Sequence, residues 1–185
     1  MSRYQDQKGA YGPEVREALR ASDPIMRRLI DVHSNSDPET WRRCGPTTDP
    51  SETLLRVVGQ QGSTSAARAI LGRLSALFSD RLPAYSDDEV RERLMAVEGI
   101  GPWSADMFLL RELGRPDVLP SEDVGVRKAV QRAYGLPAPP TPAEVNLLGE
   151  KWRPHGSLVA TYLFDSLAHA TEPTRAEQKP DSPTF

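Results

Sequence analysis

Asp123 is the residue of this 185-residue chain that is best placed to do chemistry. It follows a loop rich in glycine and proline (LGRPDVLPSED, residues 113–123) and precedes a helical pattern of apolar residues that begins at Val126. An aspartate in this position caps a helix, which by itself contributes about 1 kcal/mol. It also presents a fixed carboxylate to whatever the neighbouring segment holds. Both interpretations remain open at this point.

A glycine-rich turn lies upstream of Asp123, between two helical segments within about 87–112. The turn reads EGIG, with Gly99 and Gly101 on either side of an isoleucine, and Pro102 begins the second segment. Such a turn lets the backbone approach another molecule closely. It also directs backbone N–H groups and a helix N-terminus outward, an arrangement that suits a phosphate oxygen without any lysine. An ordinary helical hairpin with a glycine turn is the alternative interpretation.

The elements that must position these residues are all predicted to be helices. No segment shows a convincing strand alternation, and residues 158–168 form the last strongly apolar helical segment. The sequence therefore predicts an all-α fold in one domain over residues 1–170, followed by a disordered tail over 171–185. Helix-start signals recur along the chain, at Asp23-Pro24, Asp49-Pro50, Thr141-Pro142, and in the capping boxes Ser86/Glu89 and Thr141/Glu144.

Composition narrows the function classes. The single cysteine, Cys44, excludes an internal disulfide and a four-cysteine zinc or iron–sulfur site within the chain. The three histidines show no metal-ligand spacing. A net charge of −3 argues mildly against a nucleic-acid partner, although residues 53–82 carry four arginines and one acid. No apolar run is long enough to span a membrane and the first residues lack a secretory signal, so we expect a cytoplasmic protein.

The hairpin and the aspartate together resemble a known family. The stretch GIGPWSADMF (residues 99–108), followed by LPSEDVGVRKA (119–129), resembles the helix-hairpin-helix DNA glycosylase superfamily (HhH-GPD), and within it the bacterial 3-methyladenine DNA glycosylases of type II. The segments 54–70 and 152–154 are also similar to that branch. The resemblance implies two small helical lobes around a cleft. Because only 38 residues separate Gln61 from Gly99, the front lobe is expected to be shortened.

The resemblance also implies roles for individual residues. Asp123 matches the catalytic aspartate, and Trp103 and Phe164 match residues that line the pocket for the extruded base. Packing in the core is the alternative for both aromatics. Gln61 matches the side chain that fills the gap left by that base. The DNA backbone would be held at Gly99 and Gly101, and a structural Na⁺ or K⁺ by the backbone carbonyls of Met95, Val97 and Ile100.

The implied activity is base-excision repair of damaged, 3-methyladenine-type bases in double-stranded DNA. Relatives that also cut the strand carry a lysine where this chain has Trp103, and Lys8 is the only lysine before it. We therefore expect a monofunctional, monomeric enzyme that uses water, requires no cofactor, lacks an iron–sulfur cluster and acts in the nucleoid. One alternative is a catalytically weak or inactive DNA-binding module, given the short interval 61–99. Another is a helical interaction domain, which leaves the Asp123, Trp103 and Gln61 set unexplained.

Overall fold

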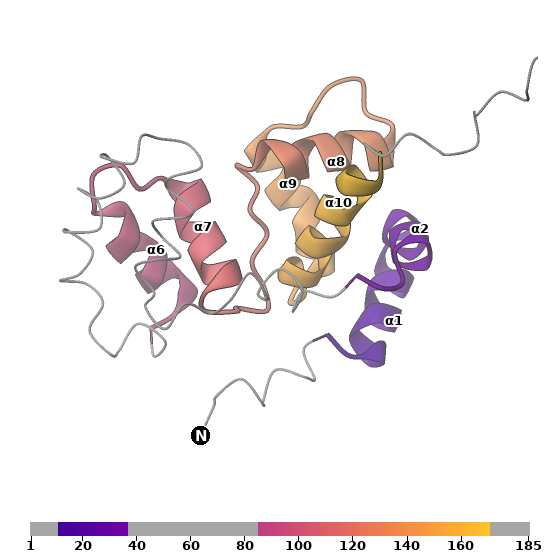
Figure 1. Cartoon of the computed structure of the whole chain (residues 1–185), viewed down its shortest axis with the longest axis horizontal. Helices are drawn as coiled ribbons and strands as arrows, with labels where there is room; N and C mark the ends of the chain where they lie inside the picture. Colours follow the sequence, from indigo (N-terminus) through magenta and orange to yellow (C-terminus); the bar gives the residue numbers. More distant parts are fainter. Residues whose placement is uncertain (1–10, 37–84, 171–185) are drawn as a thin grey trace, which may run out of the picture.

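The computed structural model describes residues 11–36 and 85–170. Every regular element in these two ranges is helical, as the sequence predicts, and none of the helices there is long and apolar enough to cross a membrane (Figure 1). The predictions for Gln61, for the short interval that follows it and for the tail lie largely outside these ranges. The elements are α1 (Pro13–Ser22), α2 (Pro24–Val32), α6 (Asp87–Met95), α7 (Pro102–Arg111), α8 (Val124–Tyr134), α9 (Pro142–Gly149), the 3₁₀ helix η3 (Glu150–Trp152) and α10 (Gly156–Ala170).

The helices begin where the capping signals predict. The Ser86 hydroxyl accepts from the Glu89 N–H at 3.3 Å, and the Glu89 carboxylate accepts from the Ser86 N–H at 2.8 Å. The Thr141/Glu144 pair repeats this reciprocal arrangement at the start of α9. Each box satisfies N–H groups that a helix terminus otherwise leaves without a partner. The capping predictions are thus confirmed here, whereas Asp49-Pro50 lies outside the described residues.

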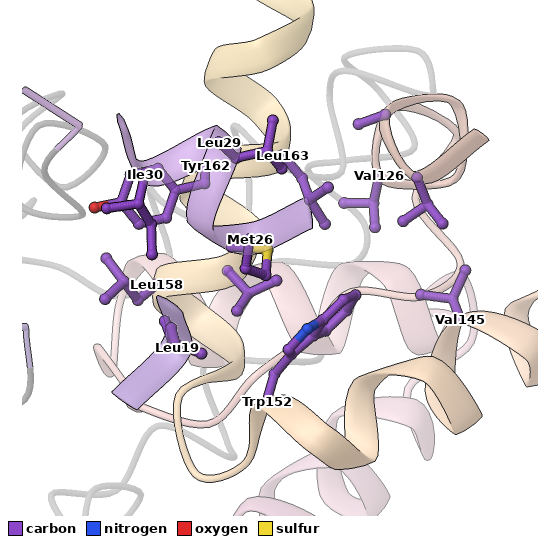
Figure 2. Packing of buried hydrophobic residues seen from close by; sticks show 13 residues of the cluster. Leu19, Met26, Leu29, Ile30, Val126, Val145, Trp152, Leu158, Tyr162 and Leu163 are labelled. Atoms are coloured by element: carbon purple, nitrogen blue, oxygen red, sulfur yellow. The ribbon is translucent and has the colours of Figure 1, made fainter. Parts of the chain in front are cut away.

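Two clusters of buried apolar side chains organise the described helices. The first, around Leu94, Ile100 and Phe108, packs α6 against α7. The second packs α1 and α2 against the C-terminal helices, and Figure 2 shows Leu19, Met26 and Ile30 from the N-terminal pair beside Trp152, Leu158 and Tyr162. In Figure 1 the hairpin of α6 and α7 lies to one side of α8, α9 and α10. Trp103 on α7 and Asp123 at the start of α8 therefore belong to elements that are buried in different cores.

Asp23 is a buried carboxylate that contacts residues of the second cluster. It caps α2 by accepting from the Ile25 N–H at 2.9 Å. It also accepts from the indole Nε1 of Trp152 at 3.1 Å and from the Tyr134 hydroxyl, and it pairs with the Lys151 ammonium at 2.8 Å. These contacts join α2 to the end of α8 and to η3. Burial alone would raise the pKa of Asp23, but the hydrogen bonds, led by that from Lys151, lower it below its ordinary value.

We expect Asp23→Asn to reduce the free energy of unfolding by about 2 kcal/mol, because it removes charge from hydrogen bonds to a buried carboxylate. The folded pKa lies below the ordinary 3.8, so the ionised group stabilises the fold above that pH, and this contribution is lost as the pH falls through the folded pKa. Denaturant unfolding at several pH values measures both effects. Asp31→Asn, which removes an exposed carboxylate paired with Arg20, is the matched control. An equal loss in both variants, or a difference that does not shrink in acid, contradicts the role of Asp23.

Candidate functional site

Asp123 and Trp103 are in direct contact. The Trp103 indole Nε1 donates to Asp123 Oδ2 at 2.6 Å, and the Val126 N–H donates to Asp123 Oδ1 at 3.0 Å. The carboxylate is thus the N-cap of α8, as predicted, and also the partner of a side chain on α7. Asp123 and Trp103 are both only half-buried. Two hydrogen bonds therefore fix the orientation of the carboxylate, and its residue is not fully buried.

The loop between α7 and α8 is held by the first residues of α10. The Ser157 hydroxyl donates to the Arg115 carbonyl at 2.5 Å and accepts from the Val118 N–H at 3.0 Å. The Gly156 N–H donates to the Asp117 carboxylate at 3.0 Å. A Cβ on Gly156 would come within 3.2 Å of the loop backbone, so the loop passes closely over the helix start. Sequence analysis identified the loop as glycine- and proline-rich but did not find the serine that anchors it.

Phe164 borders the same region from α10. It is half-buried and packs against the second cluster. A Cβ built on Gly125 would lie 3.5 Å from Phe164 Cε1 and 2.8 Å from Asp123 Oδ1, so the ring and the carboxylate flank one small space. The structure thus brings Asp123 and Trp103 together with Phe164 close by. Core packing explains part of the burial of both aromatics, and their predicted role toward a base stays a prediction.

The two hairpin glycines differ in what they require. Gly99 has φ 95°, a backbone conformation that residues with a side chain rarely adopt. Gly101 has φ −98° and caps α7, and a Cβ built on it meets nothing within 4 Å. Val97 and Ile100 are buried in the first cluster and fix the turn between them. Backbone geometry therefore explains the glycine at 99, whereas the described part of the protein gives no reason for one at 101.

The predicted cation ligands are backbone carbonyls of this turn. The Val97 carbonyl accepts from the Ile100 N–H at 3.0 Å and has a second lone pair available. Carbonyl oxygens suit Na⁺ or K⁺, so the donor chemistry of Met95, Val97 and Ile100 fits the predicted ion. Within the described ranges, no cluster of histidine, cysteine and acidic side chains could hold a metal ion.

A buried ion pair stiffens the hairpin behind the turn. Arg91 of α6 donates from Nε to Asp106 Oδ1 of α7 at 2.7 Å, and Asp106 is almost fully buried. Burial raises the pKa of Asp106, and the hydrogen bond from Arg91 opposes that shift without cancelling it. The sequence contains one signal of this pair, a charged residue within the apolar run SADMFLL. We did not recognise it from sequence alone.

A cavity of about 450 Å³ lies near the hairpin but does not include the Trp103–Asp123 pair. Its lining is rich in charged side chains, among them Arg91, Asp106 and Arg153. These three already form ion pairs within the protein. Half-buried Asp123, held by the two hydrogen bonds described above, is therefore a better candidate for chemistry than this cavity.

Comparison with known proteins finds relatives that are described as glycosylases or as a DNA repair enzyme. No protein-family model matches the chain. It is 35% identical over 172 residues to DNA-3-methyladenine glycosylase 1 of Schizosaccharomyces pombe, covering 86% of this chain and 71% of that protein. It is 31% identical over 91 residues to the putative DNA-3-methyladenine glycosylase YfjP of Bacillus subtilis, and 35% identical over 167 residues to the probable bifunctional transcriptional activator/DNA repair enzyme AlkA of Mycobacterium tuberculosis. The matches cover 49% and 88% of this chain but only about a third of those two relatives, 32% and 33%.

Solved structures share the fold. The S. pombe 3-methyladenine DNA glycosylase in complex with abasic DNA superposes with a TM-score of 0.66 at 23% identity, covering 84% of this chain and 97% of that one. The 3-methyladenine DNA glycosylase from Archaeoglobus fulgidus gives 0.63 at 18% identity, covering 92% and 76%. The all-α arrangement described above is therefore a fold that these proteins share.

The contrast between the hairpin glycines gives a folding prediction. Gly99→Ala should lower the free energy of unfolding by about 1–2 kcal/mol, because its positive φ strains any side-chain-bearing residue. Gly101→Ala should change it by less than about 0.5 kcal/mol, as for a substitution that meets no neighbour. Denaturant unfolding of the two variants beside the parent measures this difference. Equal losses in both would contradict the geometry of the turn.

Proposed function

The chain belongs to the helix-hairpin-helix DNA glycosylase superfamily, and from this premise we propose that it excises alkylated, 3-methyladenine-type bases from double-stranded DNA by hydrolysing the N-glycosidic bond. The observation that carries the proposal is the Asp123 carboxylate, half-exposed and held by the Trp103 indole at 2.6 Å. We propose the complete reaction for this chain. Two of the relatives are about three times as long as the region that they share with it.

Asp123 would act on the sugar. An alkylated purine carries positive charge and leaves readily, and its departure gives the sugar oxocarbenium character. A carboxylate aimed at that sugar stabilises charge that exists only in the transition state. It can also orient the attacking water. Because Trp103 and Val126 N–H groups hold one oxygen each, the carboxylate needs little reorganisation when the charge develops.

Trp103 would also contribute to the choice of base. A damaged base costs least to extrude from the stack. An indole face then favours a cationic base over a neutral one by about 0.5–2 kcal/mol. Phe164, on the other side of Gly125, would complete the apolar wall of the pocket, and Gln61 would fill the gap left in the duplex.

The hairpin would hold the DNA backbone. The absence of a side chain at Gly101 leaves open space at the start of α7, where N–H groups and the helix dipole attract a phosphate. A Na⁺ or K⁺ held by the carbonyls of Met95, Val97 and Ile100 would add positive charge next to that phosphate. Such contacts with phosphate do not require lysine or arginine side chains. They therefore suit a chain with a net charge of −3.

We propose a monofunctional, monomeric enzyme acting on the nucleoid in the cytoplasm. With Trp103 in place of the lysine that forms a Schiff base, water is the nucleophile. The relatives are named as glycosylases, which does not favour the alternative of an inactive binding module.

Asp123→Asn should reduce excision of 3-methyladenine from a methylated duplex at least about 100-fold, as when a single transition-state contact is removed. The amide preserves size and a capping oxygen, so DNA affinity should change little. Single-turnover release of the base and fluorescence anisotropy measure the two properties. Glu122→Gln, at the exposed neighbouring carboxylate, is the control that should excise at the parental rate. An Asn variant with parental activity would remove Asp123 from this role.

The same excision assay identifies the nucleophile. A water-using enzyme leaves an intact abasic strand that breaks only after alkali or heat. Borohydride should trap no covalent adduct between protein and DNA. A trapped adduct would show that an amine of this chain attacks the sugar.

Gly101→Val should weaken binding to all duplexes at least about tenfold, whatever their sequence or lesion, because contacts to phosphate carry no base information. Since a Cβ at this position meets no protein atom, the variant should remain folded. Anisotropy with matched damaged and undamaged duplexes, beside thermal melting, measures both. Ala143→Val makes a similar enlargement at an exposed position of α9 and serves as control. A folded Gly101→Val variant with undiminished affinity would remove the hairpin from the DNA interface.

A further inference from the structure

Gly125 occupies the second residue of α8, where a glycine has no evident conformational purpose. It is not among the glycines with positive φ, which in the described residues are Gly99, Gly114 and Gly135. Glycine is also one of the poorest helix formers. Local structure therefore favours another residue at this position, and the reason for a glycine must lie in what surrounds it.

The surroundings of Gly125 are the groups of the candidate site. A Cβ on this residue would lie 2.8 Å from Asp123 Oδ1, a separation that real side chains essentially never show. On the other side the Cβ would lie 3.5 Å from Phe164 Cε1 and from Leu167 Cδ1, which is ordinary van der Waals contact. A side chain at 125 therefore conflicts with Asp123 alone among these neighbours. A methyl group fits against α10 but not beside the carboxylate.

The carboxylate cannot move away without loss. The oxygen that a methyl group would displace, Oδ1, accepts the capping hydrogen bond from the Val126 N–H. The other oxygen accepts from the Trp103 indole at 2.6 Å. Rotating or shifting the group to relieve a 2.8 Å contact lengthens at least one of these bonds, because the two oxygens are held from different helices, one by the α8 backbone and the other by a side chain of α7.

We infer that Gly125 is a positioning residue: its missing side chain is what allows the Asp123 carboxylate to cap α8 and accept the Trp103 N–H at the same time. The inference rests on the proposed function for its effect on excision. It goes beyond that function by assigning a role to a residue that touches neither base nor sugar, and it predicts that the smallest possible side chain at 125 is enough to misplace the carboxylate.

The main test compares Gly125→Ala with the parent. We expect single-turnover excision to fall at least tenfold, affinity for the lesion duplex to stay within twofold, and the melting temperature to stay equal or rise. Asn146→Ala is the matched control, since it also raises helix propensity, at an exposed and uncharged position of α9. It should leave excision unchanged. Parental excision by Gly125→Ala would overturn the inference, as would a rate loss accompanied by an equal loss of affinity.

A second readout does not depend on activity. The indole N–H resonance of Trp103, assigned with a Trp103→Phe variant, reports its hydrogen bond to Asp123. In Gly125→Ala it should move toward its position in Asp123→Ala, where the acceptor is absent. If the parent excises no base, the proposed function fails, and this resonance alone decides whether Gly125 positions the carboxylate. An unmoved resonance overturns the inference.

A double-mutant cycle on the melting temperature tests the inference even if Gly125→Ala folds poorly. In an Asp123→Ser background the hydroxyl still caps α8 but the longer carboxylate is gone. Alanine at 125 should then raise the melting temperature by more than it does in the parent, because only helix propensity remains. Equal effects in the two backgrounds would show that the carboxylate and a side chain at 125 do not conflict, and would overturn the inference.

Discussion

The hydrogen bond from the Trp103 indole to the Asp123 carboxylate joins two parts of the molecule that have separate cores. The body of α7 is buried with α6, whereas α8 is buried with α10 and the N-terminal helices. The glycine turn is rigid relative to α7, and the carboxylate is rigid relative to α8. The distance between the glycine turn and the Asp123 carboxylate therefore depends on how these two helices meet, and the indole contact joins them at that point.

Helix termini contribute to both parts of the candidate site. Asp123 lies at the positive end of the α8 dipole, and the hairpin presents the start of α7. The acidic residues Asp87, Asp88 and Glu89 lie in the first turn of α6, where they complement the dipole of that helix. Negative charge at these three positions thus serves helix formation.

Local sequence rules predicted the helix starts, the hairpin and the capping role of Asp123, because caps, glycine turns and apolar periodicity act over a few residues. They did not predict the contacts of Asp23, whose partners Tyr134 and Trp152 are more than 100 residues away. Nor did they find the Arg91–Asp106 pair or the role of Ser157, since each depends on how two helices pack. Gly125 shows the same limit. A glycine near a helix start is visible in the sequence, but the atom that it avoids is not.

The second core also imposes an order on how the chain can mature. Leu19, Met26 and Ile30 share their cluster with side chains of the C-terminal helices, including Leu158, Tyr162 and Leu163 of α10 (Figure 2), and the α6–α7 hairpin is synthesised between these two groups. On the ribosome the hairpin, whose helices are adjacent in sequence, can close while α1 and α2 still lack their partner. The loop that carries Asp123 is anchored by Gly156 and Ser157, so it too waits for α10. A nascent chain can consequently form the glycine turn of the hairpin before the Asp123 loop is anchored, and that anchoring is complete only when the last helix has docked.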